Sequence, residues 1–240
     1  MPRFWISIEC RGRGDRGMVR MISIASSVPG RAMLDRALLS ASNRLGQIMA
    51  MPAARHRWTA REVRQLIADS PLATPRYELV DGELLVTPSP AWPHQRAVQI
   101  LIRELSAYLH AEPVGHVGSS PFDVEPEPEL IVQPDVFVLP IAESRRLLGE
   151  MPARALMLAV EILSPSSSRH DRVIKRPAYQ RHVPEYWAVD LDARLVERWA
   201  SKDERAELIT KRLDWQPVGA TTAFALDLPS YFAEIFLEGE

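Results

Sequence analysis

Hydrophobic side chains recur every three or four residues in the middle of the chain, the spacing that lines one face of an amphipathic helix. The stretch follows Pro93, and charged side chains such as Arg103 and Glu104 fall largely between the apolar positions. Those positions are Ala97, Val98, Leu101, Leu105, Tyr108 and Leu109. The pattern therefore predicts a long helix that begins near Pro93.

A short helix and a β-hairpin are predicted before this long helix. Thr59 and Glu62 have the spacing of a capping box and precede a run with apolar positions at helical intervals. Farther along, two β-prone segments within residues 77–86 flank Asp81 and Gly82, the pair that best tolerates positive φ in a two-residue turn. Organised sequence therefore begins with these two elements.

Beyond the long helix, apolar segments of strand length alternate with helical segments. Strands are predicted at about 116–124, 130–139, 156–163, 185–190, 194–200 and 206–212, and helices at about 169–182 and 229–237. This order of elements indicates an α/β or α+β fold with a mixed β-sheet flanked by helices. We expect residues 51–240 to form one such domain.

Two acidic residues lie inside strongly apolar segments. Asp135 lies between Leu-Ile-Val-Gln-Pro and Val-Phe-Val-Leu, and Glu161 lies between Leu-Met-Leu-Ala-Val and Ile-Leu. An ionised carboxylate in such surroundings loses much of its water unless it faces solvent, takes up a proton or coordinates a cation. If the two strands are neighbours, the carboxylates converge on a site for a hard cation such as Mg²⁺.

Lysine is rare in the chain, which makes Lys175 a candidate for a chemical role. Of the 29 lysines and arginines, only Lys175, Lys202 and Lys211 are lysines. Arginine is therefore the usual cation here, and a compact ammonium differs chemically from a planar guanidinium. Beside a metal site, an ammonium orients water or stabilises developing negative charge.

Each candidate also has an explanation that involves no site. Asp135 could end a strand after a proline, Glu161 could face water from an edge strand, and Lys175 could be a solvated helix charge. His94 opens the long helix and is a candidate contact for a phosphate or for metal-bound water, with an exposed histidine as the alternative. Glu83 on the hairpin is a candidate third carboxylate, with a surface charge as the alternative.

Composition narrows the class of protein. The chain has 240 residues, of which 46% are hydrophobic and 25% are charged, and this is ordinary for a globular protein. The single cysteine, Cys10, excludes an internal disulfide framework and cysteine-based zinc sites, and it fits a reducing compartment. No apolar run approaches the roughly 20 residues that span a bilayer. We therefore expect a cytoplasmic protein.

Charge is unevenly distributed along the chain. Residues 1–50 carry eight arginines and three acidic residues, whereas residues 51–240 carry 21 basic and 28 acidic residues. The acidic body lacks the overall electrostatic footprint of a nucleic-acid binder, so contacts to nucleic acid must come from a local patch or through bound metal. We interpret residues 1–50 as a disordered or mis-annotated extension. A basic arm for a polyanion and an organelle-targeting leader are the alternatives.

Several short motifs resemble, in their order and spacing, a known family. They are Tyr77-Glu78-Leu79-Val80-Asp81-Gly82-Glu83, Ser89-Pro90 with His94, Gln133-Pro134-Asp135, Val160-Glu161-Ile162-Leu163-Ser164-Pro165-Ser166, Asp171 with Lys175, and Val183-Pro184-Glu185-Tyr186-Trp187-Ala188-Val189-Asp190. With them, the span from about Trp58 to Trp199 resembles the Uma-two family of restriction endonucleases, within the PD-(D/E)XK nuclease superfamily. The resemblance implies a restriction-endonuclease-like core in which Asp135 and Glu161 bind Mg²⁺, for which Mn²⁺ can substitute, and a lysine completes the catalytic site.

The chain departs from the superfamily pattern at this lysine. The pattern has its lysine two residues after the second acid, where this chain has Leu163, and the resemblance places the lysine at Lys175 on the following helix. Ser168 and Asp171 have the spacing of a capping box for that helix. Pro177 lies well inside it, so we expect a kink or an end there, which leaves the direction of Lys175 open.

The resulting hypothesis is a Mg²⁺-dependent endonuclease that hydrolyses DNA phosphodiester bonds with Asp135, Glu161 and Lys175 as catalytic residues. A homodimer is expected, because two symmetric sites are the simplest way to cut both strands of a duplex. One alternative is a catalytically degenerate nuclease fold that acts as a binding or assembly module. Another is a phosphohydrolase that acts on a small nucleotide.

Overall fold

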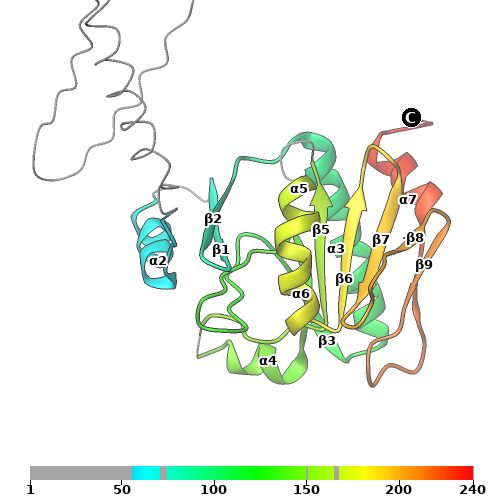
Figure 1. The fold of residues 1–240 in the computed structure, drawn as a ribbon. Helices are drawn as coiled ribbons and strands as arrows, with labels where there is room; N and C mark the ends of the chain where they lie inside the picture. Colours follow the sequence, from blue (N-terminus) through cyan, green and yellow to red (C-terminus); the bar gives the residue numbers. More distant parts are fainter. Residues whose placement is uncertain (1–55, 71–74, 150, 165–167, 240) are drawn as a thin grey trace, which may run out of the picture. The chain divides into compact units, whose positions relative to one another are not determined.

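The structure of the protein is a computed structural model that describes residues 56–70, 75–149, 151–164 and 168–239 (Figure 1). The interpretation of residues 1–50 lies outside these residues and stays a prediction. None of the described helices is both long and apolar enough to cross a membrane.

A six-stranded mixed β-sheet forms the centre of the fold (Figure 1). In spatial order its strands are β3 (Gly115–Ser119), β4 (Val136–Pro140), β5 (Leu158–Leu163), β6 (Glu185–Asp190), β7 (Leu195–Ala200) and β8 (Glu207–Ile209). β5 and β6 run parallel, and the other neighbouring pairs are antiparallel. A parallel pair needs a crossover connection, and the helical segment between β5 and β6 provides it.

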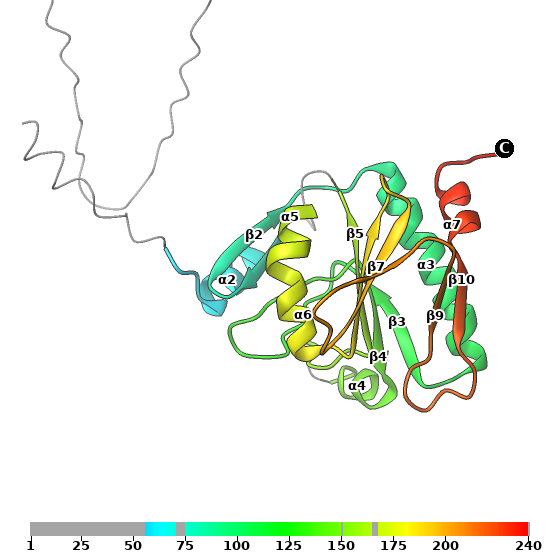
Figure 2. The same ribbon diagram turned by 45° about the vertical axis from the view of Figure 1, so that its right-hand side comes forward.

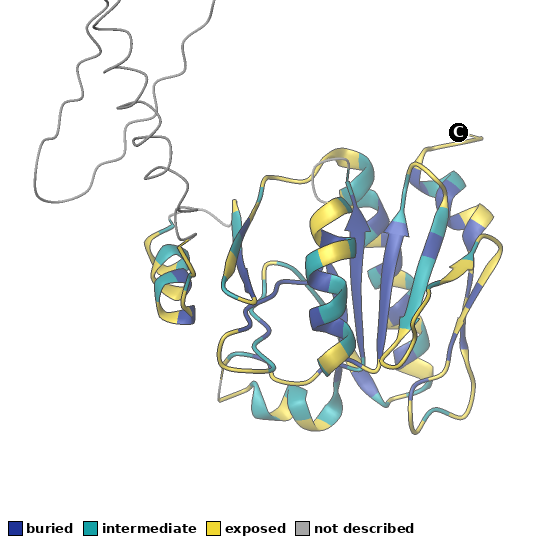
Figure 3. Cartoon of the chain, viewed as in Figure 1, coloured by how far each residue is buried: buried dark blue, intermediate teal, exposed yellow. Residues whose placement is uncertain are grey.

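Helices cover both faces of this sheet (Figures 1 and 2). One face carries α3 (Trp92–Ala111) and α7 (Leu228–Ile235), and the other carries α5 (Ser168–His170), the π-helical turn η1 (Asp171–Lys175) and α6 (Arg176–His182). Val160 and Ile162 of β5 belong to the core under α3, whereas Ala159 belongs to the core under α6. Both faces of β5 are therefore buried (Figure 3), and the predicted α/β fold with a mixed sheet flanked by helices is confirmed.

Both helices predicted for the N-terminal half are present. α2 (Ala60–Asp69) begins after a capping box in which the side chains of Thr59 and Glu62 each accept from the other residue's backbone N–H. α3 begins one residue before Pro93 and buries the predicted apolar face through Ala97, Leu101, Leu105 and Leu109. The helical spacing of the sequence thus identified both the element and its buried side.

The predicted hairpin is also confirmed. β1 (Arg76–Val80) and β2 (Glu83–Thr87) pair in an antiparallel two-stranded sheet of their own. Asp81 and Gly82 form the turn with φ of 50° and 80°, the positive values that this residue pair tolerates. Backbone hydrogen bonds between Leu79 of β1 and the segment before β4 fix the hairpin beside the central sheet.

The predicted strand around Asp135 is shorter than expected. Only Val136–Pro140 belongs to the sheet, whereas Ile131 and Val132 form isolated bridges outside it. Pro134 has no N–H to donate to a ladder, so it suits the position just outside a strand. Asp135 therefore directly precedes β4 instead of lying within a strand.

Several short elements were not predicted. β9 (Arg212–Trp215) and β10 (Phe224–Asp227) form a separate antiparallel pair, so the single strand expected at 206–212 is divided between β8 and β9. α4 (Ile141–Arg146) follows β4 directly. Each of these elements has only a few residues, which is too short for a hydrophobic period to be distinct.

Candidate active site

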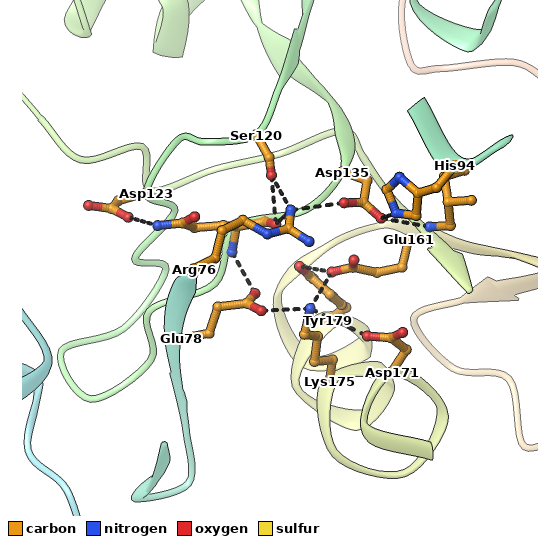
Figure 4. Close-up of polar contacts among 12 residues, drawn as sticks. Arg76, Glu78, His94, Ser120, Asp123, Asp135, Glu161, Asp171, Lys175 and Tyr179 are labelled. Atoms are coloured by element: carbon orange, nitrogen blue, oxygen red, sulfur yellow. Dashed lines mark hydrogen bonds and ion pairs between the residues drawn. The ribbon is translucent and has the colours of Figure 1, made fainter. Parts of the chain in front are cut away.

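Asp135 and Glu161 lie next to each other at one end of two neighbouring strands. β4 and β5 are antiparallel with Val136 opposite Val160, and continuing this register by one residue sets Asp135 opposite Glu161. Opposite residues project from the same face of a sheet, and Figure 4 shows both carboxylates within one cluster of polar side chains. Both residues are buried, with exposed fractions of 3% and 1%.

Both carboxylate oxygens of Asp135 accept hydrogen bonds. Nη1 of Arg76 donates to Oδ1 over 2.8 Å, and the backbone N–H of Ile162 donates to Oδ2 over 2.9 Å. Nε2 of His94 lies 3.0 Å from Oδ2. Because these partners come from β1, β5 and α3, three separate elements fix the orientation of this carboxylate.

Lys175 lies at the centre of a second group of carboxylates (Figure 4). Its Nζ is 2.8 Å from Oε2 of Glu78, 3.1 Å from Oε1 of Glu161 and 3.4 Å from Oδ1 of Asp171. The hydroxyl of Tyr179 donates a further hydrogen bond to Oε1 of Glu161 over 2.8 Å. The ammonium is thus held in direct contact with the second predicted acid.

The π-helical turn η1 gives Lys175 this direction. Asp171, which the sequence assigned to a capping box, begins the turn, and its carbonyl oxygen accepts from the N–H of Arg176 five residues later. Pro177 follows, and it has no N–H to donate to Val173 in an α-helical register. The wider turn accommodates the proline, so the helical segment continues past Pro177 to His182 and does not end there, while the irregularity expected at the proline takes the form of a π-helical turn.

The surroundings move the pKa values of the two acids in opposite directions. Burial alone raises the pKa of Asp135, but the contact with His94 and the charges of Arg76 and Lys175 outweigh it and hold this pKa well below its usual value. For Glu161, burial outweighs the attraction of Lys175 and raises the pKa well above its usual value. Neighbouring carboxylates outweigh burial at Lys175 and raise its pKa, which keeps it charged. Divergent pKa values in one cleft are typical of functional sites.

These groups line a pocket of about 380 Å³. Asp135, Glu161, Asp171 and Lys175 form its charged side, together with Arg76 and His94. The remaining walls come from the segment between β2 and α3, from the turn after β6 and from the end of α7. The pocket therefore gives a ligand direct access to the two acids and the ammonium.

Four of the five predicted site residues meet in this pocket. Asp135, Glu161, Lys175 and His94 all line it. Glu83 does not, because it is exposed at the first position of β2. The hairpin instead contributes the carboxylate of Glu78, a buried residue of β1, to the cluster.

Four residues of the cluster were not predicted as site residues: Arg76, Glu78, Asp171 and Tyr179. Glu78 gives a weaker signal than the two predicted acids, because its short strand also contains Arg76, although the structure buries it fully. Arg76 gives no such signal, because its partner Asp135 is 59 residues away in the sequence. Tyr179 resembles an ordinary core residue, and only its hydroxyl contact distinguishes it.

The donor chemistry of the cluster fits a divalent cation. Four buried carboxyl groups meet only two cations, Arg76 and Lys175, and repulsion from the neighbouring acids adds to burial in raising the pKa of Glu161. Mg²⁺ and Mn²⁺ prefer oxygen ligands. The described residues contain no group of three or more His, Cys, Asp or Glu arranged to hold a metal. Asp135 and Glu161, which both line the pocket, are the acids that would supply ligands to such a cation, with water completing its coordination.

Comparison with known proteins gives a family and a shared fold. The family model Uma2, described as "Putative restriction endonuclease", matches residues 60–228. Among solved structures, the crystal structure of "a putative nuclease belonging to DUF820 from Anabaena variabilis" is similar, with a TM-score of 0.58 and 18% sequence identity. The match covers 70% of this chain and 96% of that chain. No curated protein matches the chain.

Proposed function

The chain belongs to the Uma2 family, as its motifs predicted, and we propose that it is a metal-dependent nuclease that hydrolyses phosphodiester bonds in DNA. The observation that carries the proposal is the contact between Lys175 and Glu161 beside Asp135, which assembles two acids and an ammonium at one pocket. These are the residue types that the nuclease hypothesis requires. The lysine comes from a helix instead of from the strand that carries the second acid.

Asp135 and Glu161 are the proposed metal ligands. Mg²⁺ or Mn²⁺, when bound, lowers the pKa of a coordinated water and neutralises charge on the phosphate. Asp135 is suited to this role because its neighbours keep it ionised. Arg76 and His94 orient its carboxylate and act through it, as the hydrogen-bond partners of metal ligands commonly do.

Lys175 is the proposed electrostatic catalyst. It orients the attacking water or stabilises the negative charge that develops on the phosphate. Glu78 and Asp171 are positioning residues, because they fix the ammonium from two further directions. They also raise the pKa of Lys175 against the effect of burial, which keeps the ammonium charged.

The N-terminal end of α3 offers the phosphate a second electropositive contact. Ala91, Pro93 and His94 line the pocket at this end. In the described part of the chain no side chain caps the helix there. Free N–H groups and the helix dipole attract anions at such an end. This end of α3 is therefore the proposed second contact for the phosphate.

Substitution of the two acids tests the proposal. Asp135→Ala and Glu161→Ala are each expected to lose Mg²⁺-dependent nicking of plasmid DNA, while Glu83→Ala, at an exposed carboxylate outside the pocket, retains it. Removing one partner of a buried ion pair can unfold a protein. Asp135→Asn and Glu161→Gln, which preserve shape, therefore accompany the alanine variants, and thermal unfolding checks each of them. Unchanged nicking in both alanine variants contradicts the proposal.

A second candidate is a catalytically degenerate nuclease fold that acts as a binding or assembly module. The observation that favours it is the engagement of Lys175 by three carboxylates, which competes with its action on a substrate. Calorimetric titration with Mg²⁺ separates the candidates when it is combined with the nicking assay. A degenerate site binds the metal and leaves the plasmid intact.

The homodimer expected from the sequence stays a prediction, and sedimentation of the full chain tests it. A particle of twice the chain mass supports two symmetric sites. A monomer that nicks DNA contradicts the need for a second subunit.

A further inference from the structure

The pocket has an apolar side that the proposed hydrolysis does not use. Pro88 and Pro90 line it before α3, Leu191 lines it after β6, and Phe236 lines it at the end of α7. Metal-assisted attack on a phosphate requires charged and polar groups. The apolar side chains therefore indicate a second, apolar part of the ligand.

Two aromatic side chains are exposed at helix ends that contribute residues to the pocket. Phe236 is 36% exposed, and Trp92, in the first turn of α3, is 58% exposed. Arg96 of α3 connects this helix to the end of α7. Its guanidinium donates hydrogen bonds to the backbone carbonyls of Ile235 and Glu234 over 3.2 and 2.6 Å. The two aromatic residues are thus held on adjoining helix ends, at and beside the pocket.

The charge of the domain bears on the kind of DNA that it binds. Residues 51–240 carry 21 basic and 28 acidic residues, whereas proteins that grip a duplex through its phosphates use strongly basic faces. Single strands are also held by stacking of their bases on aromatic side chains. A pocket with aromatic and proline walls on an acidic body therefore favours a ligand that is bound through a base.

The size of the pocket agrees with this ligand. A volume of about 380 Å³ lies in the range of sites for small molecules and suits one nucleotide. In a duplex each base is paired and stacked, so it reaches a pocket only from a single strand, from a flap or after extrusion.

We propose that the apolar side of the pocket binds a base, and that the substrate is DNA with an unpaired nucleotide beside the phosphate to be cleaved. This inference rests on the nuclease function proposed above and specifies its substrate. The base packs against Phe236, Leu191 and the proline-rich segment, while the phosphate lies at Asp135 and Glu161. The same pocket thus holds both ends of one nucleotide.

Binding of a fluorescent oligonucleotide tests the inference without hydrolysis. The probe is a single-stranded DNA oligonucleotide that contains 2-aminopurine, whose fluorescence is quenched on stacking, and it is added to the full chain with Ca²⁺ in place of Mg²⁺. We expect the single strand to bind about tenfold more tightly than a blunt duplex of the same sequence. Phe236→Ala should weaken this binding about tenfold, because stacking of the bound base is lost, and Trp92→Ala should do the same, because Trp92 offers the next base of the strand a stacking surface beside the pocket.

A matched control removes an apolar side chain elsewhere. Leu208 of β8 is 64% exposed and does not line the pocket, so Leu208→Ala should bind the probe as the unchanged protein does. If Phe236→Ala fails to fold, Trp92→Ala carries the test, since its side chain is largely exposed. Equal affinity for single strand and duplex, or unchanged affinity in every aromatic variant that folds, overturns the inference.

The substrate inference and the catalytic proposal fail in different measurements. Nicking that persists in Asp135→Ala and Glu161→Ala contradicts the catalytic proposal, and it leaves the preference for single strands to be measured separately. Absence of that preference contradicts the base-binding surface, even where Mg²⁺-dependent nicking is intact.

Discussion

The backbone N–H of Ile162 donates a hydrogen bond to Oδ2 of Asp135 over 2.9 Å. Ile162 directly follows Glu161, so this bond couples the side chain of the first acid to the main chain of the strand that carries the second. The spacing of the two carboxylates is therefore set by the backbones of β4 and β5. A pair held by rigid strands is preorganised for a shared ligand.

Lys175→Met removes the charge of the ammonium and keeps a similar volume. It leaves Glu78, Glu161 and Asp171 without their shared cation, and loss of one partner from a buried ion pair costs about 3–5 kcal/mol. We expect the free energy of unfolding in urea to fall by about this amount, and metal-dependent cleavage to be lost. Lys202→Met, at an exposed lysine, is the control. A loss of stability no larger than in the control contradicts the structural role of Lys175.

Tyr179 and Tyr186 stack on each other, and replacing each by phenylalanine compares the loss of two different hydroxyl hydrogen bonds. The hydroxyl of Tyr179 donates to Oε1 of Glu161 over 2.8 Å, whereas the hydroxyl of Tyr186 lies 3.5 Å from the carbonyl oxygen of Asp171. Tyr179→Phe should lower the free energy of unfolding by about 1–3 kcal/mol, because the buried Oε1 of Glu161 loses one of its two donors and keeps only Lys175. Tyr186→Phe should cost less than about 1 kcal/mol, since its bond is long. Equal losses in urea denaturation would refute this ranking.

Glu112 links the end of α3 to the segment before β10, and its contacts predict a pH dependence of stability. Its carboxylate accepts hydrogen bonds from the hydroxyl and N–H groups of Thr221 and Thr222, which lower its pKa from 4.5 to about 2. Because the folded-state pKa is depressed, this stabilisation is complete above pH 4.5 and is lost as the pH falls toward 2. Glu112→Gln should therefore lower stability near neutral pH.

The stability difference between the unchanged protein and Glu112→Gln should then shrink between about pH 5 and pH 3. Urea denaturation of both proteins at several pH values measures it. Because the same comparison is made at each pH, titration of other carboxylates cancels to first order. A difference that does not change with pH is inconsistent with the depressed pKa.

Gly115 in β3 is packed too closely against β4 to accept a side chain. A Cβ at this position would lie 2.5 Å from the carbonyl oxygen of Leu139. This oxygen belongs to the backbone of β4, so it cannot move without displacing the strand. Gly115→Ala should therefore cost about 1–3 kcal/mol of stability in urea denaturation. Gly149→Ala is the control, because a Cβ there meets no atom within 4 Å, and restriction of the unfolded chain should make it neutral or stabilising by up to about 1 kcal/mol. A larger loss at Gly149 would contradict this comparison.

Asp135 and Glu161 could be identified from the sequence because the evidence for them lies in the apolar residues on either side of each acid. A carboxylate within a strongly apolar segment needs a partner wherever the segment lies in the fold, and this holds for Asp135 and Glu161. The same reasoning applies to Glu78, but a hairpin strand is expected to face solvent on one side, which hides the signal. By contrast, Arg76 could not be identified, because its contact with Asp135 arises only from the packing of the hairpin beside β4.

The direction in which the side chain of Lys175 projects could not be predicted from the sequence either. A helical pattern specifies a face of about 3.6 residues per turn, and one π-helical turn shifts the residues on either side of it relative to each other. Pro177 indicated that the helix was irregular there, and it did not specify whether the chain would end, bend or widen. The widened turn and the ion pairs of Lys175 are tertiary outcomes.

The proposed position of the catalytic lysine in η1 has a consequence for how such proteins are recognised. A search that demands lysine two positions after the second acid rejects this chain, because Leu163 stands there. A spatial criterion, an ammonium within reach of a buried acid pair, would retain it. Under that proposal the strand position two residues after Glu161 needs no catalytic group, and Leu163 there belongs to the core under α6.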